Sequence, residues 1–216
     1  MEKIKTLLAH RFFKILKWVF LILVGAYLVL VAVRVVHLFN LDKTNAQVEK
    51  IHNTKLTMDD VMGKNLPPDP GAEADKTVAG IDANENGIRD DVELAVFKEY
   101  PNSAKTRAVL LQYALALQME VVQPFVNTTI ADKVIGEESR ANFCITDTLV
   151  PRRSPESDRN NTDMEKIDFF IKFIEDKQLN TDIRIKAQKD FYKNLGNFAN
   201  STKNEDCDID VLKLLN

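Results

Sequence analysis

The sequence predicts a mainly α-helical protein with one helix that crosses a membrane. Residues 18–33 contain no charged side chain, and apolar residues later in the chain recur at helical spacing. No segment shows the alternation of apolar and polar residues expected of a strand. Of the 216 residues, 45% are apolar and 28% are charged, which is typical of a folded domain. We therefore expect a membrane anchor followed by a helical domain.

The predicted membrane helix covers residues 18–39. These residues would form a helix about 33 Å long, enough to cross the roughly 30 Å hydrocarbon core of a bilayer. Only Arg34 and His37 interrupt the apolar run, and Arg34 is near enough to the outer end for its side chain to extend to the interface. An arginine with a function inside the membrane is the alternative interpretation.

Charged residues beside this segment predict its orientation. Basic residues are retained on the cytoplasmic side of a membrane. Five of them precede the apolar run, namely Lys3, Lys5, Arg11, Lys14 and Lys17. We expect residues 1–17 to be a cytoplasmic tail of a single-pass inner (plasma) membrane protein, with the domain periplasmic or extracellular. A cleaved signal peptide is the alternative, although the apolar run exceeds the usual 7–15 residues or so and no A-x-A-like cleavage site follows.

The two parts of the chain carry opposite charge. Residues 1–41 have a net charge of +5 within a total of −3, which leaves −8 for residues 42–216. Nucleic-acid binding depends largely on Lys and Arg that neutralise phosphates, so an acidic domain excludes it as the expected function. The apolar run instead predicts the lipid bilayer as a partner, through residues 18–39.

Residues 40–79 are predicted to connect the anchor to the domain. Within this segment, residues 42–62 show weak helical periodicity, which predicts a short helix that extends the anchor. Its apolar positions are Val48, Ile51, Leu56 and Met58. A proline-rich linker over residues 65–71 follows, because proline removes backbone donors and restricts the residue before it.

Residues 82–93 place oxygen-bearing side chains at the spacing of a metal-binding loop. Such a loop takes ligands from positions 1, 3, 5, 7, 9 and 12 and needs a glycine at position 6 for a sharp turn. The predicted ligands are Asp82, Asn84, Asn86, Ile88 through its carbonyl, Asp90 and Glu93, and the glycine is Gly87. Carboxylate, amide and carbonyl oxygens are the ligands that Ca²⁺ prefers, so we predict a bound Ca²⁺.

The stretch resembles EF-hand calcium loops and, more closely, thrombospondin type 3-like calcium loops of bacteria. The resemblance covers 12 of 216 residues and implies the ligand positions alone. At position 8, where EF-hands keep an apolar residue that pairs with a second loop, this chain has Arg89. The expected affinity is that of extracellular modules, on the order of 10⁻⁴ to 10⁻³ M. An acidic turn that caps the next helix without an ion is the alternative.

Four to five helices are predicted in residues 80–216, the calcium-binding domain. The first leaves the loop and covers about residues 90–99, where a Tyr-Pro-Asn sequence ends it. The second starts after a cap at Asn102 or Ser103 and ends before Pro124. Its predicted core positions are Leu110, Ala114, Leu117 and Val121.

A weaker third helix is predicted over residues 128–143, interrupted by Gly136 and followed by a polar loop over residues 151–161. Two further helices form a predicted hairpin, and a capping box from Thr162 to Glu165 opens the first of them. The first carries Met164, Ile167, Ile171 and Ile174, and the second shows Ile183, Ala187, Phe191, Leu195 and Phe198 on one face. We expect these aromatic residues to pack in the core, with a ligand groove as the alternative.

Cys144 and Cys207 are the only cysteines, and both follow the predicted membrane helix. An even count in an oxidising compartment predicts a disulfide, while two separate buried thiols are the alternative. The bridge would close a loop of about 63 residues and contribute roughly 4 kcal/mol to stability. The acids around the second cysteine are expected to lie in a solvated tail. They are Glu205, Asp206, Asp208 and Asp210.

Catalytic side chains are scarce in the predicted domain, and we expect a protein that is not an enzyme. His10, His37 and His52 all precede it, so neither a Ser-His-Asp triad nor a His-based zinc site is expected. No Walker loop, G-x-G-x-x-G or G-x-S-x-G motif occurs. A pair of carboxylates could still act together, as in glycosidases.

The sequence therefore predicts a membrane-anchored extracytoplasmic calcium-binding protein, a binding or structural component of the cell envelope with an envelope protein as its partner. A carboxylate-dependent envelope hydrolase with structural calcium is the alternative. In a third interpretation the calcium is purely structural and the anchor delivers a component of a membrane complex. A surface cleft with two facing carboxylates away from the ion would favour the hydrolase, and an apolar patch would favour the binding protein.

Overall fold

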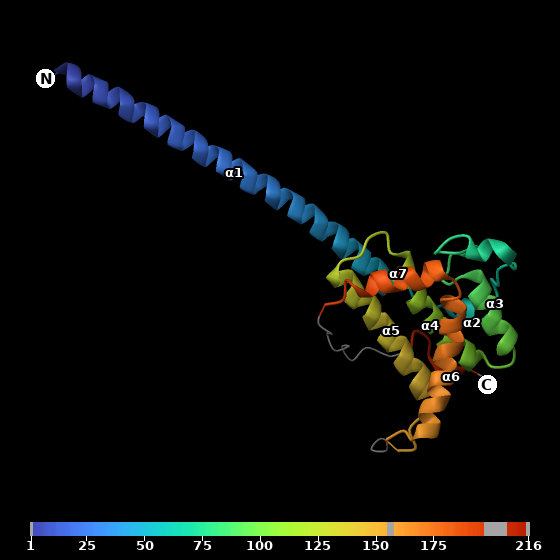
Figure 1. The fold of residues 1–216 in the computed structure, drawn as a ribbon. Helices are drawn as coiled ribbons and strands as arrows, with labels where there is room; N and C mark the ends of the chain where they lie inside the picture. Colours follow the sequence, from blue (N-terminus) through green and yellow to red (C-terminus); the bar gives the residue numbers. More distant parts are fainter. Residues whose placement is uncertain (1, 155–157, 197–206, 215–216) are drawn as a thin grey trace. The chain divides into compact units, whose positions relative to one another are not determined.

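A computed structural model describes residues 2–154, 158–196 and 207–214, with side chains from Lys14 onward. These described residues contain seven α-helices and two short 3₁₀ helices but no strand, so the predicted mainly helical fold is confirmed (Figure 1). The chain divides into two compact units, Met1–Ala46 and Gln47–Asn216.

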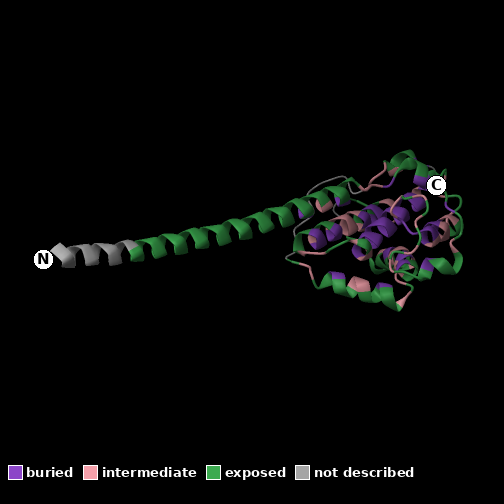
Figure 2. Cartoon of the chain, turned by 90° about the horizontal axis from the view of Figure 1, so that it is seen from above, coloured by how far each residue is buried: buried purple, intermediate pink, exposed green. Residues whose placement is uncertain are grey.

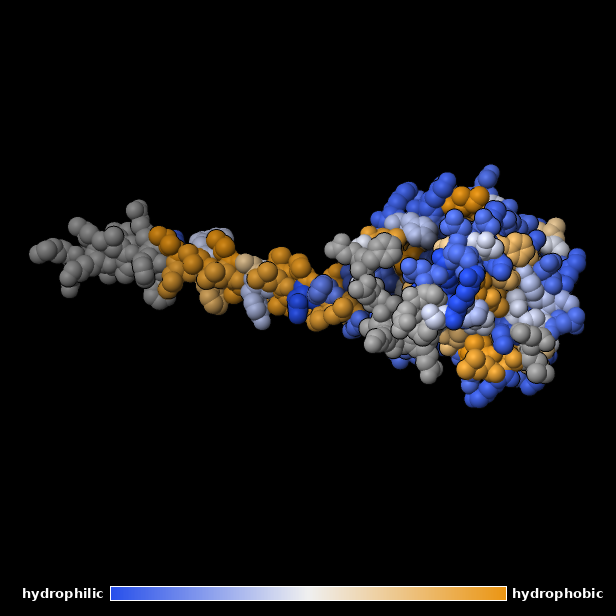
Figure 3. All heavy atoms as spheres, turned by 90° about the horizontal axis from the view of Figure 1, so that it is seen from below, coloured by the Kyte–Doolittle hydropathy of each residue, from blue (hydrophilic) through white to orange (hydrophobic). Residues whose placement is uncertain are grey.

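Helix α1 (Glu2–Asn53) contains the predicted membrane segment. Its apolar side chains are exposed along most of this length, with Trp18 at 67% and Leu30 at 68% (Figure 3). Within the described residues, α1 is the one helix long and apolar enough to cross a membrane, and its mean hydropathy reaches 2.7. Its length and composition are therefore compatible with contact with a lipid bilayer.

The segment after the anchor differs from the prediction of one helix over residues 42–62. Helix α1 continues to its end at Asn53, and a separate helix α2 (Met58–Met62) begins after a break. A capping box at Thr57 causes this division. Its Oγ1 accepts the N–H of Asp60 at 3.3 Å, and the Asp60 carboxylate accepts the N–H of Thr57 at 2.8 Å. A 3₁₀ helix, η1 (Gly71–Asp75), then begins at the last residue of the predicted linker.

Helix α4 (Ala104–Val122) lies at the centre of the second unit, and nearly all of its residues are buried (Figure 2). It packs against α2, α3 (Asp90–Glu99), α5 (Thr128–Leu149), α6 (Asn161–Gln178) and α7 (Asp182–Tyr192). The Ser103 Oγ caps α4 by accepting the N–H of Thr106 at 3.1 Å, as predicted. The predicted core positions that are buried are Leu110, Ala114 and Leu117, whereas Val121 is half-buried. The bounds of α3 also agree with the prediction.

The predicted helix over residues 128–143 was shorter than α5 (Thr128–Leu149), and its predicted interruption at Gly136 was wrong. The helix continues through Gly136 and ends six residues beyond the predicted end. A glycine inside a helix costs only about 1 kcal/mol relative to alanine. Burial of Ala141, Cys144 and Ile145 on the far side of the glycine offsets that cost.

The hairpin formed by α6 (Asn161–Gln178) and α7 (Asp182–Tyr192) is present, but two details of its prediction were wrong. The capping box of α6 uses Asn160 and Asp163 instead of Thr162 and Glu165, because asparagine is also a strong cap.

The predicted inner face of α7 is also partly wrong. Ile183 is 44% exposed and Arg184 is fully buried in its place. Phe191 packs in the core as expected, whereas α7 ends before Leu195. Phe198 lies outside the described residues.

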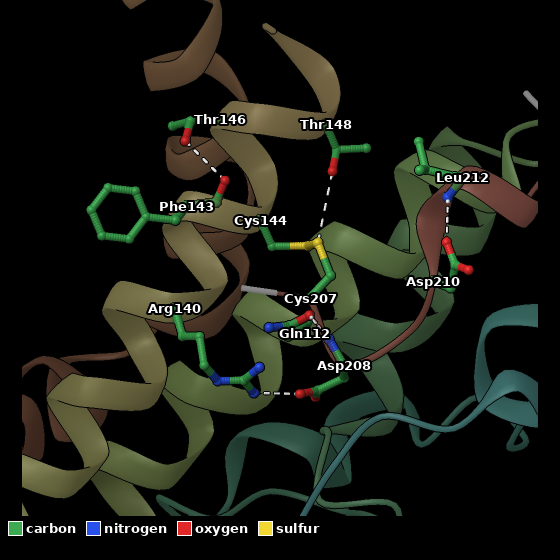
Figure 4. Close-up of a disulfide and its surroundings, with 10 residues drawn as sticks. All are labelled: Gln112, Arg140, Phe143, Cys144, Thr146, Thr148, Cys207, Asp208, Asp210 and Leu212. Atoms are coloured by element: carbon green, nitrogen blue, oxygen red, sulfur yellow. Dashed lines mark hydrogen bonds and ion pairs between the residues drawn. A yellow bond between two sulfur atoms is a disulfide. The ribbon is translucent and has the colours of Figure 1, made fainter. Parts of the chain in front are cut away.

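The predicted disulfide joins Cys144 of α5 to Cys207 near the C-terminus (Figure 4). The prediction of a solvated tail was wrong for Asp208, whose side chain is 2% exposed and forms ion pairs with Arg140 and Lys55. Its backbone N–H also donates to Gln112 of α4 at 2.9 Å. Asp210 is exposed and caps the 3₁₀ helix η2 (Val211–Lys213). Glu205 and Asp206 lie outside the described residues.

We expect the double variant Cys144→Ala, Cys207→Ala to lose about 4 kcal/mol of unfolding free energy, because the 63-residue separation is no longer closed in the unfolded chain. Urea denaturation of the full-length protein in detergent measures this loss. Addition of reductant to the parent should produce a similar loss, and reductant should leave the variant unchanged. An unaltered denaturation midpoint in the variant would show that the bridge does not stabilise the fold.

Candidate calcium site

The predicted calcium loop, residues 82–93, folds around its own side chains. The two carboxylate oxygens of Asp82 accept the N–H of Asn86 at 3.1 Å and that of Gly87 at 2.9 Å. The Oδ1 of Asn86 accepts the N–H of Ile88 at 2.8 Å. These Asx-type bonds bend the backbone and bring both ends of the loop together.

Gly87 is required at the bend for two physical reasons. Its φ of 85° lies in the left-handed region, which side chains other than glycine rarely adopt. A Cβ there would also lie 2.8 Å from the Cδ1 of Leu115 on α4. The next residue, Ile88, is fully buried in the core. The loop is therefore held firmly against the central helix.

Asp90 joins the end of the loop to the start of α3. Its backbone N–H donates to the carbonyl of Ile81 at 2.9 Å, and its Oδ1 accepts the N–H of Ala83 at 3.0 Å. The Oδ2 of Asp90 is buried and has no hydrogen-bond partner. Burial raises the pKa of this carboxyl, and the nearby Asp91 adds to the increase.

Glu93 lies one turn further along α3 and faces back into the loop. Its Oε2 accepts the side-chain N–H of Asn84 at 3.0 Å and that of Asn86 at 3.2 Å. Its Oε1 is buried without a partner, and the residue is only 1% exposed. Burial raises the pKa of Glu93 to about 7, although the two amide donors lower it.

Asp82, Asp90 and Glu93 form no ion pair with a basic side chain in the described part of the chain. Burial also raises the pKa of Asp82. Ionised carboxylates in such surroundings cost free energy unless a positive charge compensates them. The structure thus joins Glu93 to the two amides of the predicted ligand set, whereas Asp82 and Asp90 accept backbone N–H groups of the loop.

The donor chemistry fits Ca²⁺ in its oxygen types, and the two unpartnered buried oxygens are available for a cation. Asn84 and Asn86 direct their N–H₂ groups towards Glu93, so each amide would have to present its Oδ1 instead. Within the described residues, no group of three or more His, Cys, Asp or Glu side chains is arranged to hold a metal. The fit therefore depends on the mixed set of carboxylates, amides and one carbonyl.

Arg89, at loop position 8, has a role that sequence reasoning missed. Its side chain is fully buried and pairs with Asp91 through two N–H···O bonds of 2.9 and 2.6 Å. It also donates to the carbonyls of Lys177 and Gln178 at 3.1 Å each. Position 8 therefore connects the loop to the end of α6 rather than to a second loop. The arginine at a position where EF-hands keep an apolar residue was the sequence signal for this different contact.

Arg184 of α7 makes a similar connection to the chain just before the loop. Its guanidinium donates to the carbonyls of Thr77 and Val78 at 3.1 Å and pairs with Asp75 at 2.7 Å. This hydrogen bond and ion pair lower the pKa of Asp75. No sequence pattern predicted a buried arginine here, because the helical stripe favoured Ile183 at the inner face.

A surface pocket of about 480 Å³ lies on α5 and α7. It is lined by Ile135, Glu138, Ser139, Asn142, Phe143 and Tyr192. Glu138 is hydrogen-bonded to Glu120 of α4, which is 2% exposed. Sequence reasoning did not find this pair, because no spacing rule relates residues on two different helices.

Comparison with protein-family models, with curated proteins and with solved structures found no match to this chain. The functional interpretation therefore depends on the residues and their geometry.

We expect Arg89→Met to lower the unfolding free energy by about 2–3 kcal/mol, because two buried carbonyls lose a donor and Asp91 loses its partner. Urea denaturation of the full-length protein in detergent provides the measurement. Arg153→Met, at an exposed arginine, is the matched control and should change stability by less than about 0.5 kcal/mol. Equal effects of the two substitutions would contradict a structural role for the Arg89 contacts.

Proposed function

We propose that this chain is a membrane-anchored extracytoplasmic calcium-binding protein that serves as a binding or structural component of the cell envelope. One observation carries the proposal. Asp90 and Glu93 each bury a carboxylate oxygen without a partner, inside a loop that has the ligand spacing of calcium-binding loops.

Calcium would supply the positive charge that Asp90 and Glu93 lack, because Arg89 of the same loop pairs with Asp91. Asp82, Asn84, Asn86, Asp90 and Glu93 would offer side-chain oxygens, and Ile88 would offer its carbonyl. Two of these five side chains are neutral amides, so the loop carries less charge than the tightest calcium sites. This supports an affinity on the order of 10⁻⁴ to 10⁻³ M, suited to calcium outside the cytoplasm.

The membrane location is supported by α1 and its flanking charges. The exposed apolar length of α1 is matched to a bilayer, and basic residues outnumber acids before it. This arrangement favours an uncleaved signal-anchor with the N-terminus in the cytoplasm and the second unit in the periplasm or outside the cell.

Exposed apolar side chains on the helices of the second unit support a protein partner. The largest of them on α5, α6 and α7 include Phe143, Met164, Phe169 and Ile183, each at least 44% exposed. Aromatic residues and methionine are enriched at protein–protein interfaces. An envelope protein that contacts these side chains is the partner we propose.

The alternative function, a carboxylate-dependent hydrolase, would have to use the Glu120–Glu138 pair beside the pocket. The carboxylates of a glycosidase stand about 5 Å or more apart with the substrate between them, whereas these two are hydrogen-bonded to each other. Glu120 is also too deeply buried to line the pocket. We therefore favour the binding protein.

We expect millimolar Ca²⁺ to raise the unfolding temperature of the full-length protein in detergent relative to EGTA. The gain in unfolding free energy should be about 1.4–2.7 kcal/mol at ten to a hundred times the dissociation constant. Glu93→Gln should abolish the gain, because it removes one charge and the bidentate ligand. Glu85→Gln is the control, since Glu85 is an exposed acid in the same loop that is not among the predicted ligands. Parent and Glu93→Gln proteins that respond equally to Ca²⁺ would contradict the proposal.

A pull-down from solubilised envelopes, with and without chelator, separates a binding role from purely structural calcium. Partners that the parent and Glu85→Gln retain in Ca²⁺ and that Glu93→Gln loses would support the binding role. If the unfolding temperature responds to Ca²⁺ but no partner is retained in either condition, the calcium is structural and the binding role is wrong.

A further inference from the structure

Two carboxyl groups from different helices meet in the interior of the second unit. Glu120 of α4 and Glu138 of α5 share a hydrogen bond, and Glu120 is only 2% exposed. Helix α7 covers the pair. The Nε2 of Gln188 donates to one Glu120 oxygen at 2.8 Å, and the hydroxyl of Tyr192 donates to the other at 3.3 Å. Three helices therefore converge on one carboxyl pair.

The groups that face this pair are acidic or neutral. Besides Gln188 and Tyr192 of α7, they are Tyr113 on α4 and Glu175 on α6, which are hydrogen-bonded to each other at 3.4 Å. Within the described residues, no Lys, Arg or His forms an ion pair with either member of the pair. Ionised carboxylates are acceptors only, so a hydrogen bond between two of them requires one proton.

The surroundings favour retention of that proton at neutral pH. Burial raises the pKa of Glu120 to about 8, and the negative charge of Glu138 adds to the increase. Burial also raises the pKa of Glu138, and Glu175 adds a repulsive contribution. Burial raises the pKa of both Tyr113 and Tyr192, so these hydroxyls stay neutral donors.

We propose that Glu120 and Glu138 form a proton-dependent latch, in which one shared proton holds α5 against α4 and its loss at alkaline pH loosens that contact. Glu138 and Tyr192 line the pocket of about 480 Å³, which gives protons a route between the pair and solvent. The latch is separate from the calcium loop and does not depend on the proposed function.

The direction of the pH effect follows from the raised affinity of the folded pair for its proton. An unfolded glutamate has a pKa near 4.5, so the folded state binds more protons between that pH and about 8. The stabilisation is fully present below about pH 4.5 and is lost as the pH rises through about 8. The two carboxyls titrate as a coupled pair, so the measured midpoint belongs to both.

Urea denaturation of the full-length protein in detergent, from about pH 5 to about pH 9 at constant Ca²⁺, tests the latch. Relative to Glu120→Gln, the unfolding constant of the parent should increase about tenfold per pH unit between about pH 5 and 8. A glutamine cannot release the proton but still donates an N–H to Glu138. Glu165→Gln, at an exposed glutamate of α6, should retain the parental pH profile. Parallel profiles for the parent and Glu120→Gln would overturn the proposal.

A local readout follows α5 itself. Trypsin cleavage at Lys133, exposed on α5, should accelerate in the parent relative to Glu120→Gln as the pH rises from about 7 to about 9. An unchanged cleavage ratio would contradict loosening of α5.

Infrared difference spectroscopy of Glu93→Gln, which lacks the other buried carboxyl with a pKa of about 7, decides the protonation state without a substitution in the pair. The carbonyl stretch of a buried protonated carboxyl should be present at neutral pH and should disappear through about pH 8. Absence of this band at neutral pH would also overturn the latch.

Discussion

The structure around the loop depends on one physical constraint, the burial of carboxylates without a basic partner. Glu93 and Asp90 are each 1% exposed, and each retains an oxygen that no described protein group satisfies. Such groups are tolerated only when they are protonated or when a cation compensates their charge. The proposed calcium would meet this requirement, and Glu93 is already hydrogen-bonded to both predicted amide ligands, Asn84 and Asn86.

Two buried arginines, Arg89 and Arg184, attach the loop segment to the rest of the domain. These arginines bring positive charge into the region, but each forms an ion pair with an acid that is not a predicted ligand. Arg89 pairs with Asp91, and Arg184 pairs with Asp75. Both arginines also donate to backbone carbonyls, so they connect the loop segment to the α6–α7 hairpin. The arginines thus stabilise the loop without neutralising its buried acids.

The elements that depend on residues close together in the sequence were predicted correctly. The cap at Ser103 follows from capping chemistry and agrees with the structure. The bounds of α3 also agree, although its N-cap, Arg89, makes no side-chain capping bond. The continuation of α5 through Gly136 and the burial of Arg184 depend on contacts with other helices, so no periodicity could show them. The same reason applies at the candidate sites. Ligand spacing lies within twelve consecutive residues, whereas the Glu120–Glu138 pair forms only when α4 and α5 pack.

Isothermal titration calorimetry of the full-length protein in detergent tests the central claim most directly. We expect one Ca²⁺ per chain with a dissociation constant on the order of 10⁻⁴ to 10⁻³ M. Absence of binding heat at millimolar Ca²⁺ in a folded sample, or equal binding by the parent and Glu93→Gln, would contradict the claim that these buried carboxylates hold a calcium ion.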